Sequence, residues 1–516
     1  MSVALATLLW FWPPDGDDAY HHTIGAVEQS RAWNEGAVWP RYHRGWNGGT
    51  GTFAPTIYSP IPLSVQGGLA WVVGDGRRAV GLSLAVALLM ASVALVFASR
   101  APITALVVLS PYVMAVALSR STTTEAWALV GAAAVVTLAM PGRRLTRSRG
   151  LGLAAAVLWV AGCQVGMLLQ LGWLLGVAWA VTLVRHWRGA GDSRVEAARS
   201  LADAVSWGLA GLVAAAVLWL PAIIDARHLA VPELVSGPLD WRRNFLPDGS
   251  QLGLLLTATA ASLVVVAVIV MTRGESGNRG ALAAAIVVGV VLSTPLSAPL
   301  WHLPKMEILQ FPWRFLGPST VVAVVAVGGL RGRWRLASCA LLLLPLTLLP
   351  VRITSSSHSV PTNSAPAELA ILAHQQWGLA PVLPSATGFY SSGFHRLESL
   401  EHLGRQAAQV VSVDRSASGG SWRVEMSEPG LALLPIQWWP EWEIQSEGHE
   451  LTYVNRRGLV AIELERGTFE IDASLRRSGS RTLGALLSIV GLAALVVLLM
   501  RSGRDHHSTL TPEADG

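Results

Sequence analysis

The stretch PPDGDDAYHHTIGAVEQSRAWNEGAVWPRYHRGWNGGTGTFAPTIYSPIP, residues 13–62, follows a short apolar start and precedes a long series of apolar segments. Acids, histidines, arginines, tryptophans and glycines are concentrated in it, whereas the chain on either side is mostly hydrophobic. Polar groups are costly within hydrocarbon, so this stretch belongs outside it. We interpret residues 13–78 as the first external loop of a polytopic membrane protein and as its candidate site of chemistry.

The composition places most of the chain in a membrane. Of its 516 residues, 52% are hydrophobic and 14% are charged. Apolar runs of roughly 18 to 22 residues, long enough to cross ~30 Å of hydrocarbon, recur along the sequence. The positive charge is almost entirely arginine beside these runs, with Lys305 the single lysine, which is typical of cytoplasmic loops and does not favour a nucleic-acid partner. Cys163 and Cys339 lie within apolar runs and predict neither a disulfide nor a metal framework.

The hydrophobic pattern predicts a mainly α-helical transmembrane bundle of about twelve helices. The predicted spans are 1–12, 79–98, 101–119, 122–140, two short helices within 151–184 joined by a tight bend near Gln164 to Gln170, 204–224, 252–271, 281–300, 316–330, 335–350 and 481–501.

Arginine clusters set the expected orientation. Arginines gather at 143–149, 185–199, 273–279 and 331–335. The positive-inside rule places these linkers and both termini in the cytoplasm. The expected location is the inner membrane of a bacterial cell, as a multi-pass protein. This works only if 57–73, which contains two prolines, lies at the external surface without crossing.

A β-sandwich domain is predicted outside the membrane before the last helix. Apolar and polar residues alternate along 422–426, 460–464 and 468–475, and Glu447-Gly448 and Arg457-Gly458 are turn signals. The predicted domains are a transmembrane domain at 1–351, the sandwich with its Ser/Thr/Pro-rich linker at 352–480, the final helix at 481–501 and a cytoplasmic tail at 502–516.

Acids and histidines alternate at the start of the external loop. On a helix, Asp17 and His21 share a face, as do Asp18 and His22. Such pairs can provide a general base or bind a divalent cation such as Mg, Mn or Ca, with Asp18 and His22 as the metal ligands. The alternative is an N-capping aspartate followed by solvated histidines.

The later part of the loop carries aromatic and basic residues among glycines. Trp39, Arg41 and Tyr58 suit contacts with a sugar, or equally a position at the lipid interface.

Two charged pairs lie where predicted helices leave the membrane. Arg120 and Glu125 flank a short external turn, and they either face a polar cavity or form a structural ion pair at the membrane edge. Lys305 and Arg314 join two spans among aromatic residues, where they suit a phosphate or diphosphate, or else snorkel to the interface. No P-loop, serine-hydrolase or zinc-protease motif has a convincing context, which argues against cytosolic ATP use and zinc proteolysis.

Taken together, these segments resemble the bacterial pyruvoyl-tetrahydropterin-synthase-related membrane proteins, which are similar to the GT-C superfamily of polyprenyl-phosphate-sugar glycosyltransferases. The segments that carry the resemblance are Asp17 to His22, Glu35 to Arg41, Tyr58 to Pro62, Arg120 to Glu125, Gln310 to Leu316, and the tail from Leu434 through Gly467.

The resemblance implies a GT-C-like fold and a transferase that takes a sugar from a lipid-linked donor to a glycan or lipid acceptor among membrane lipids. It implies Asp17 or Asp18 as catalytic base and Glu125 as a second acid. The implied donor-phosphate contacts are Lys305, Gln310 and Arg314, and the implied cavity residues are His21, His22, Trp39, Arg41, Tyr58 and Arg120. The alternative is a non-catalytic transporter or assembly partner in envelope polysaccharide export, although no inverted repeat with broken helices supports a transporter.

Overall fold

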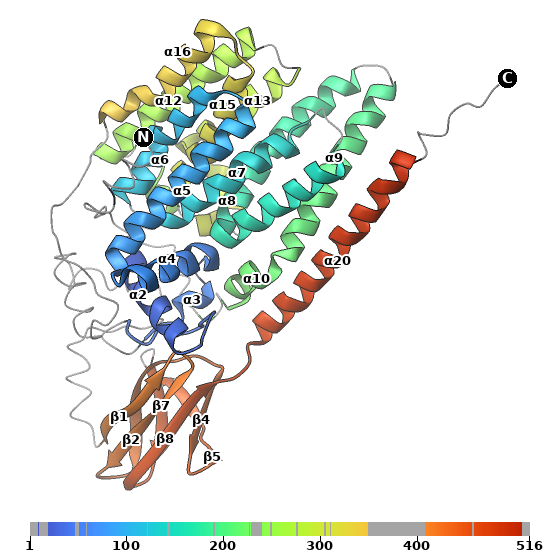
Figure 1. Cartoon of the computed structure of the whole chain (residues 1–516). Helices are drawn as coiled ribbons and strands as arrows, with labels where there is room; N and C mark the ends of the chain where they lie inside the picture. Colours follow the sequence, from blue (N-terminus) through green and yellow to red (C-terminus); the bar gives the residue numbers. More distant parts are fainter. Residues whose placement is uncertain are drawn as a thin grey trace.

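The computed structural model describes a helical bundle, a thin middle layer and a β sandwich (Figure 1). The described residues are 9, 19–46, 51–57, 59–120, 122–141, 145–188, 191–225, 228, 240–247, 250–274, 277–303, 306–309, 311–348, 408–456 and 459–507. The predicted linker at 354–384 lies outside them.

Within the described residues, four helices are long and apolar enough to cross a membrane, or up to six spans if each of two bent pairs counts as one. The four are α5 (Gly76–Ser99), α8 (Arg147–Trp187), α12 (Gln251–Arg273) and α20 (Gly479–His507). The bent pairs are α9 (Gly191–Ala214) with α10 (Ala216–Asp225), and α13 (Arg279–Leu292) with Pro295–Trp301, which comprises η7 (Pro295–Ser297) and α14 (Ala298–Trp301).

The expected twelve crossings exceed that number because several predicted spans form short helices. Residues 101–119 form a 3₁₀ segment, one α-helical turn and a π-helical turn. The segments 122–140, 316–330 and 335–350 form α7 (Thr123–Ala139), α15 (Leu316–Gly328) and α16 (Gly332–Leu343), of 17, 13 and 12 residues. The multi-pass helical class is therefore confirmed. The predicted span 1–12 lies outside the described residues except for Leu9, and among the described residues fewer helices than predicted qualify as spans by length and composition.

The predicted bend inside 151–184 is confirmed. Gln164 interrupts α8 with non-helical dihedrals of φ −164° and ψ 90°. On one side of it, Trp159 Nε1 donates to Trp127 O at 2.9 Å, near the start of α7; on the other, Trp179 Nε1 donates to Ala139 O at 2.9 Å, at the end of α7. A Cβ on Gly152, in the first arm, would lie 3.3 Å from Leu138 near the end of α7, so the first arm runs from the end of α7 to its start and the second arm runs back.

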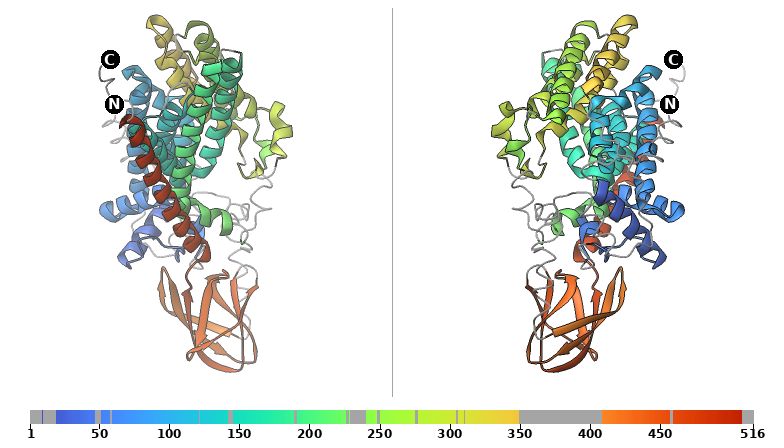
Figure 2. Two further views of the ribbon diagram at one scale, coloured as in Figure 1. Left: turned by 90° about the vertical axis from the view of Figure 1, so that its right-hand side faces the viewer. Right: turned by 90° about the vertical axis from the view of Figure 1, so that its left-hand side faces the viewer.

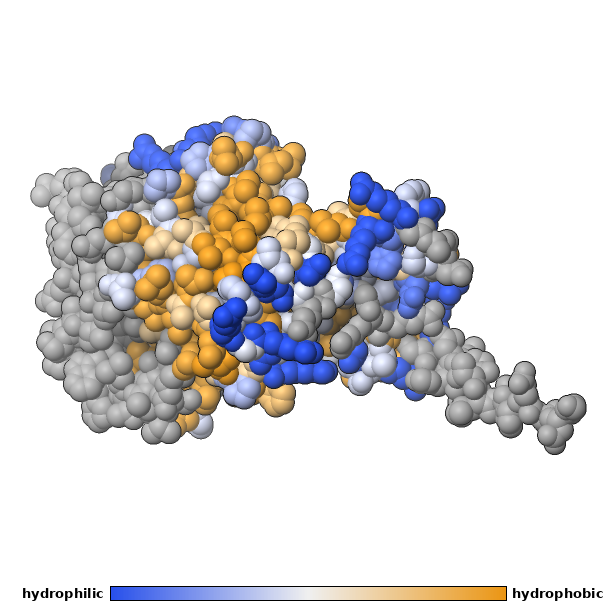
Figure 3. All heavy atoms as spheres, turned by 90° about the horizontal axis from the view of Figure 1, so that it is seen from above, coloured by the Kyte–Doolittle hydropathy of each residue, from blue (hydrophilic) through white to orange (hydrophobic). Residues whose placement is uncertain are grey.

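The arginine-rich linkers meet at the end of the bundle away from the sandwich. Arg185 donates to Gly277 O, and Asn278 donates to Pro141 O, so three linkers lie together. Figure 3 views this end and shows hydrophilic patches among apolar side chains. This placement agrees with the predicted orientation, and the face of the membrane that each end occupies stays a prediction.

The middle layer consists of α2 (Ala19–Asn34), α3 (Ala54–Ile57) and α4 (Pro60–Val73), which lie between the bundle and the sandwich (Figure 1). α4 has 14 residues and is therefore ~21 Å long, too short to cross ~30 Å of hydrocarbon. The prediction that residues 57–73 do not form a crossing agrees with this length.

The C-terminal region is a sandwich of two antiparallel sheets, ordered β1-β2-β8-β4-β5 and β3-β7-β6. The strands are β1 (Ala408–Ser416), β2 (Gly419–Met426), β3 (Gly430–Gln437), β4 (Trp442–Ser446), β5 (His449–Glu450), β6 (Tyr453–Arg456), β7 (Leu459–Leu464) and β8 (Gly467–Leu475). The three predicted strands correspond to β2, β7 and β8. Glu447 and Gly448, both with positive φ, form the predicted turn, and Arg457-Gly458 lies outside the described residues.

α20 runs along the outside of the bundle and packs on α9 and α10 (Figure 2). Small residues permit this contact: a Cβ on Gly491 would lie 2.2 Å from Ala214 N. Ser488 Oγ accepts a hydrogen bond from Val217 N at 2.9 Å, which satisfies a backbone group freed by the break between α9 and α10.

Candidate functional site

A buried ion pair lies at the sandwich end of the bundle. Glu125 is in the first turn of α7, where the helix dipole favours a carboxylate, and Arg314 is in the 3₁₀ segment η9 (Pro312–Phe315). Glu125 Oε1 lies 2.6 Å from Arg314 Nε, and the two side chains are 2% and 17% exposed. Tyr112 donates its hydroxyl to Glu125 Oε2 at 3.0 Å. The carboxylate is thus held from two sides in a site nearly closed to water.

Aromatic rings hold the two guanidinium groups of the site. The Phe311 ring centroid lies 4.7 Å from Cζ of Arg120 and 4.6 Å from Cζ of Arg314, and Trp313 lies 5.3 and 5.9 Å from the same atoms. The π-helical turn η3 (Ala115–Ser119) leads directly into Arg120. Stacking on rings fixes planar guanidinium groups and leaves their edges for anions.

A second polar network joins α2, α4 and α7 next to the ion pair. Gln66 Nε2 donates to Thr123 Oγ1 at 2.5 Å, and Thr123 Oγ1 lies 3.1 Å from His22 Nδ1. All three side chains are buried. Because Thr123 and Glu125 share the first turn of α7, this network fixes the start of α2 beside the ion pair.

The structure brings together four of the predicted site residues: Glu125 and Arg314 directly, Arg120 through Phe311, and His22 through Thr123. Asp17, Asp18, Tyr58, Lys305 and Gln310 lie outside the described residues.

A cation bound by Asp18 and His22 would compete with Thr123 for the imidazole. Among the described residues there is no group of three His, Cys, Asp or Glu side chains suited to a metal.

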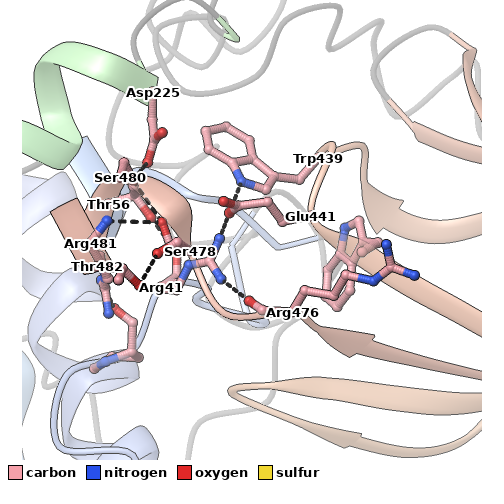
Figure 4. Close-up of polar contacts among 12 residues, drawn as sticks. Arg41, Thr56, Asp225, Trp439, Glu441, Arg476, Ser478, Ser480, Arg481 and Thr482 are labelled. Atoms are coloured by element: carbon pink, nitrogen blue, oxygen red, sulfur yellow. Dashed lines mark hydrogen bonds and ion pairs between the residues drawn. The ribbon is translucent and has the colours of Figure 1, made fainter.

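Arg41 lies in the interface with the sandwich (Figure 4), and Trp39 contacts the start of α20 beside it; their role as residues of a substrate cavity stays a prediction. Arg41 Nη1 donates to Arg476 O at 2.6 Å, and Arg41 also forms an ion pair with Glu441. Arg481, at the start of α20, donates to Trp39 O at 2.8 Å and stacks over the Trp39 ring at 5.2 Å. These residues hold the sandwich against the middle layer.

Desolvation affects the charged groups of this interface. Burial lowers the pKa of the Arg41 guanidinium, and the nearby Asp225 carboxylate partly offsets that effect. Asp225 is itself buried and accepts a hydrogen bond from Ser480 Oγ at 2.8 Å (Figure 4). The end of α10 and the start of α20 are thereby joined where the sandwich docks.

Two buried polar residues, Tyr112 and Glu28, were not predicted from the sequence. Tyr112 gave no signal because a tyrosine in an apolar run is common at a membrane interface. Glu28 is buried, pairs with Arg31 at 2.6 Å and accepts from Gly45 N at 2.7 Å. His21, a predicted cavity residue, stacks on Trp46 with ring centroids 5.3 Å apart.

These features define a polytopic helical membrane protein with a polar site at one end of its bundle and a sandwich docked over that end. No protein-family model matches the chain, and no curated protein matches it. The resemblance to the bacterial membrane family therefore stays a prediction.

Among solved structures, ArnT from Cupriavidus metallidurans bound to undecaprenyl phosphate is similar, with 16% identity and a TM-score of 0.38 over 75% of this chain and 73% of that chain.

Proposed function

We propose that the protein is an integral membrane glycosyltransferase that moves a sugar from a polyprenyl-phosphate donor to an envelope glycan or other acceptor on the sandwich side of the membrane. The observation that carries the proposal is the buried Glu125–Arg314 pair, beside Arg120 on a shared aromatic surface. A leaving phosphate needs cationic partners placed before it departs, and arginine is the side chain best suited to it.

The burial of the pair suggests a division of roles. Glu125 is 2% exposed and already in contact with Arg314 and Tyr112, so it holds the guanidinium in place more readily than it accepts a proton from an acceptor. The base in this proposal is Asp17 or Asp18, which directly precede α2 in the sequence; α2 itself contacts the first turn of α7 through His22 and Thr123.

In the proposed reaction, the aspartate removes the proton from an acceptor hydroxyl as its oxygen attacks the anomeric carbon of the sugar. The bond from that carbon to the phosphate oxygen breaks with inversion, and Arg314, with Lys305 and Gln310 from the same segment, meets the charge on the leaving phosphate. A divalent cation at Asp18 and His22 would add charge stabilisation at the phosphate.

The test is a deletion strain that carries Glu125→Gln, Arg314→Met or the pair Asp17→Asn/Asp18→Asn, with mass spectrometry of lipid-linked sugars and envelope glycans. We expect one envelope sugar to disappear and its polyprenyl-phosphate form to accumulate. Glu470→Gln is the matched control, because Glu470 forms an exposed ion pair with Arg423 on the sandwich. Unchanged glycans at normal protein levels would favour the non-catalytic alternative.

A further inference from the structure

The core of the sandwich contains two rings from a segment near the start of the chain. This segment, residues 38–53, is here called the docking segment, and it is described except for 47–50. Its Tyr42 and Phe53 are each 1% exposed and belong to the same buried cluster as the tryptophans of the sandwich. The Phe53 ring stacks on Trp439 with centroids 4.3 Å apart. The strands of the sandwich therefore do not close its core alone.

Further contacts fix the two rings in the sandwich. Phe53 N donates to the buried side chain of Gln437 at 3.0 Å, across 384 positions of the chain. The Tyr42 ring packs edge to face with Trp442 at 5.4 Å. Gly51 has φ +75°, and a Cβ on it would lie 2.1 Å from the Tyr42 ring. Only glycine therefore lets the chain pass the ring at this point.

The docking segment is bonded to α2 as well as to the sandwich. Gly45 N donates to the buried carboxylate of Glu28 in α2 at 2.7 Å. Glu35, directly after α2, accepts from Ala417 N of the sandwich at 2.7 Å and pairs with Arg44 of the docking segment at 2.7 Å. The sandwich, the docking segment and the end of α2 are thereby joined.

The other end of α2 lies at the polar site. His22 Nδ1 is 3.1 Å from Thr123 Oγ1, in the turn of α7 that carries Glu125. From His22 to Asn34, α2 rises ~18 Å. This helix therefore crosses the middle layer from the sandwich to the ion pair (Figure 1).

The burial of α2 depends on the docking segment. Glu28 and Gln29 are 2% and 1% exposed, and Gln29 Nε2 donates to Val38 O at 3.2 Å. Buried polar groups are costly unless they are bonded. α4 also packs directly on α2, because a Cβ on Gly67 would lie 2.3 Å from Gln29. Loss of the docking segment would leave α2 with α4 but without donors for its buried polar side chains.

We propose that the sandwich acts as a clamp: it holds the docking segment over α2, and α2 keeps His22 against Thr123 at the polar site. Tyr42 and Phe53 are then positioning residues for that site. The effect of the clamp on sugar transfer rests on the proposed function, whereas the coupling between the sandwich and α2 can be measured without it.

The test compares two truncations in the core of the sandwich by hydrogen exchange of the purified full-length protein in detergent. Phe53→Ala removes a ring of the docking segment. Met426→Ala is the matched control, because Met426 is buried in the same core but pairs with Gly467, at the end of β8 opposite to the one that leads into α20.

We expect both variants to exchange faster within the sandwich. Only Phe53→Ala should also raise exchange in peptides covering 20–31 and 122–126, by about tenfold or more, because loss of a buried ring shifts the local opening of a packed core by at least that factor. Phe53→Leu keeps an apolar side chain and should give the same pattern to a smaller extent. Tyr42→Phe keeps the ring and loses only the bond from Arg415, so 20–31 should exchange as in the wild type.

The second readout is the envelope glycan of the deletion strain. Phe53→Ala should lower the sugar that Glu125→Gln removes, and Met426→Ala should retain it. Faster exchange of the sandwich alone in Phe53→Ala, or faster exchange of 20–31 in Met426→Ala as well, would overturn the inference. A normal sugar level in Phe53→Ala, where Glu125→Gln loses it, would do the same.

The proposed function fails separately. If Glu125→Gln leaves the envelope glycans unchanged while Phe53→Ala raises the exchange of α2, the clamp stands and sugar transfer does not. Lost sugar in Glu125→Gln together with unchanged exchange of α2 in Phe53→Ala would reject the clamp alone.

Discussion

Arg314 Nε lies 2.6 Å from Glu125 Oε1, and these two residues come from segments 189 positions apart in the chain. The pair joins the start of α7 to the segment before α15. The pair lies beside the network of Gln66, Thr123 and His22, at the start of α7. A change in the pair should therefore affect both the stability of the fold and the proposed reaction.

Breaking this pair from one side should destabilise the fold. Arg314→Met leaves the Glu125 carboxylate buried without its cation, and removing one partner of a buried pair costs ~3–5 kcal/mol. The expected result is a lower melting temperature in detergent, measured by tryptophan fluorescence. The double variant Glu125→Gln/Arg314→Met should recover part of the loss, and additive effects would contradict the coupling.

The hydroxyl of Thr123 should matter more than its shape. Thr123→Val removes the hydroxyl to which Gln66 Nε2 donates and which lies 3.1 Å from His22 Nδ1, at a cost of ~1–3 kcal/mol. The matched control on the same helix is Thr137→Val, which loses only a bond to the carbonyl of its preceding turn. If the two variants melt at the same temperature, the network does not fix α2.

Docking of the sandwich should depend on Arg41. Arg41→Gln removes the ion pair with Glu441 while keeping a donor for Arg476 O, so the interface opens more often. We expect faster hydrogen exchange in the peptides around Trp39 and Glu441. Arg423→Gln, which breaks an exposed pair, is the control. Identical exchange in both variants would show that the Arg41–Glu441 ion pair does not hold the sandwich in place.

Acid should weaken the middle layer through His43. Burial lowers the pKa of this histidine to about 3, whereas the unfolded chain has its ordinary value near 6.5. The folded state therefore keeps the imidazole neutral while the unfolded state takes up a proton. Stability is lost as pH falls from 6.5 toward 3, by up to about 1.4 kcal/mol per pH unit.

The measurement is a series of denaturant melts between pH 7 and 4, followed at the middle layer and sandwich. His43→Phe should flatten the pH dependence, while His449→Asn on the exposed strand β5 should leave it as in the wild type. A slope that does not change in His43→Phe would exclude this histidine as the source.

The sequence by itself determined the elements whose signal is local. The long apolar helices, the bend at Gln164 and the turn at Glu447-Gly448 follow from hydrophobic run length and backbone preference, which short windows of sequence contain. The β region before α20 followed in the same way, from the alternation of apolar and polar residues along its strands. The number of crossings did not follow from the sequence, because short helices such as α15 are buried among their neighbours in the bundle.

Only the tertiary structure decided which polar residues meet. Sequence spacing placed Arg120 near Glu125, but only chain folding brings η9 against the start of α7 and Arg314 to 2.6 Å from Glu125. The contacts of Trp39 and Arg41 with the start of α20 and with the sandwich had no counterpart in the sequence pattern. Contacts between distant segments depend on how whole helices pack, and one-dimensional patterns do not contain that information.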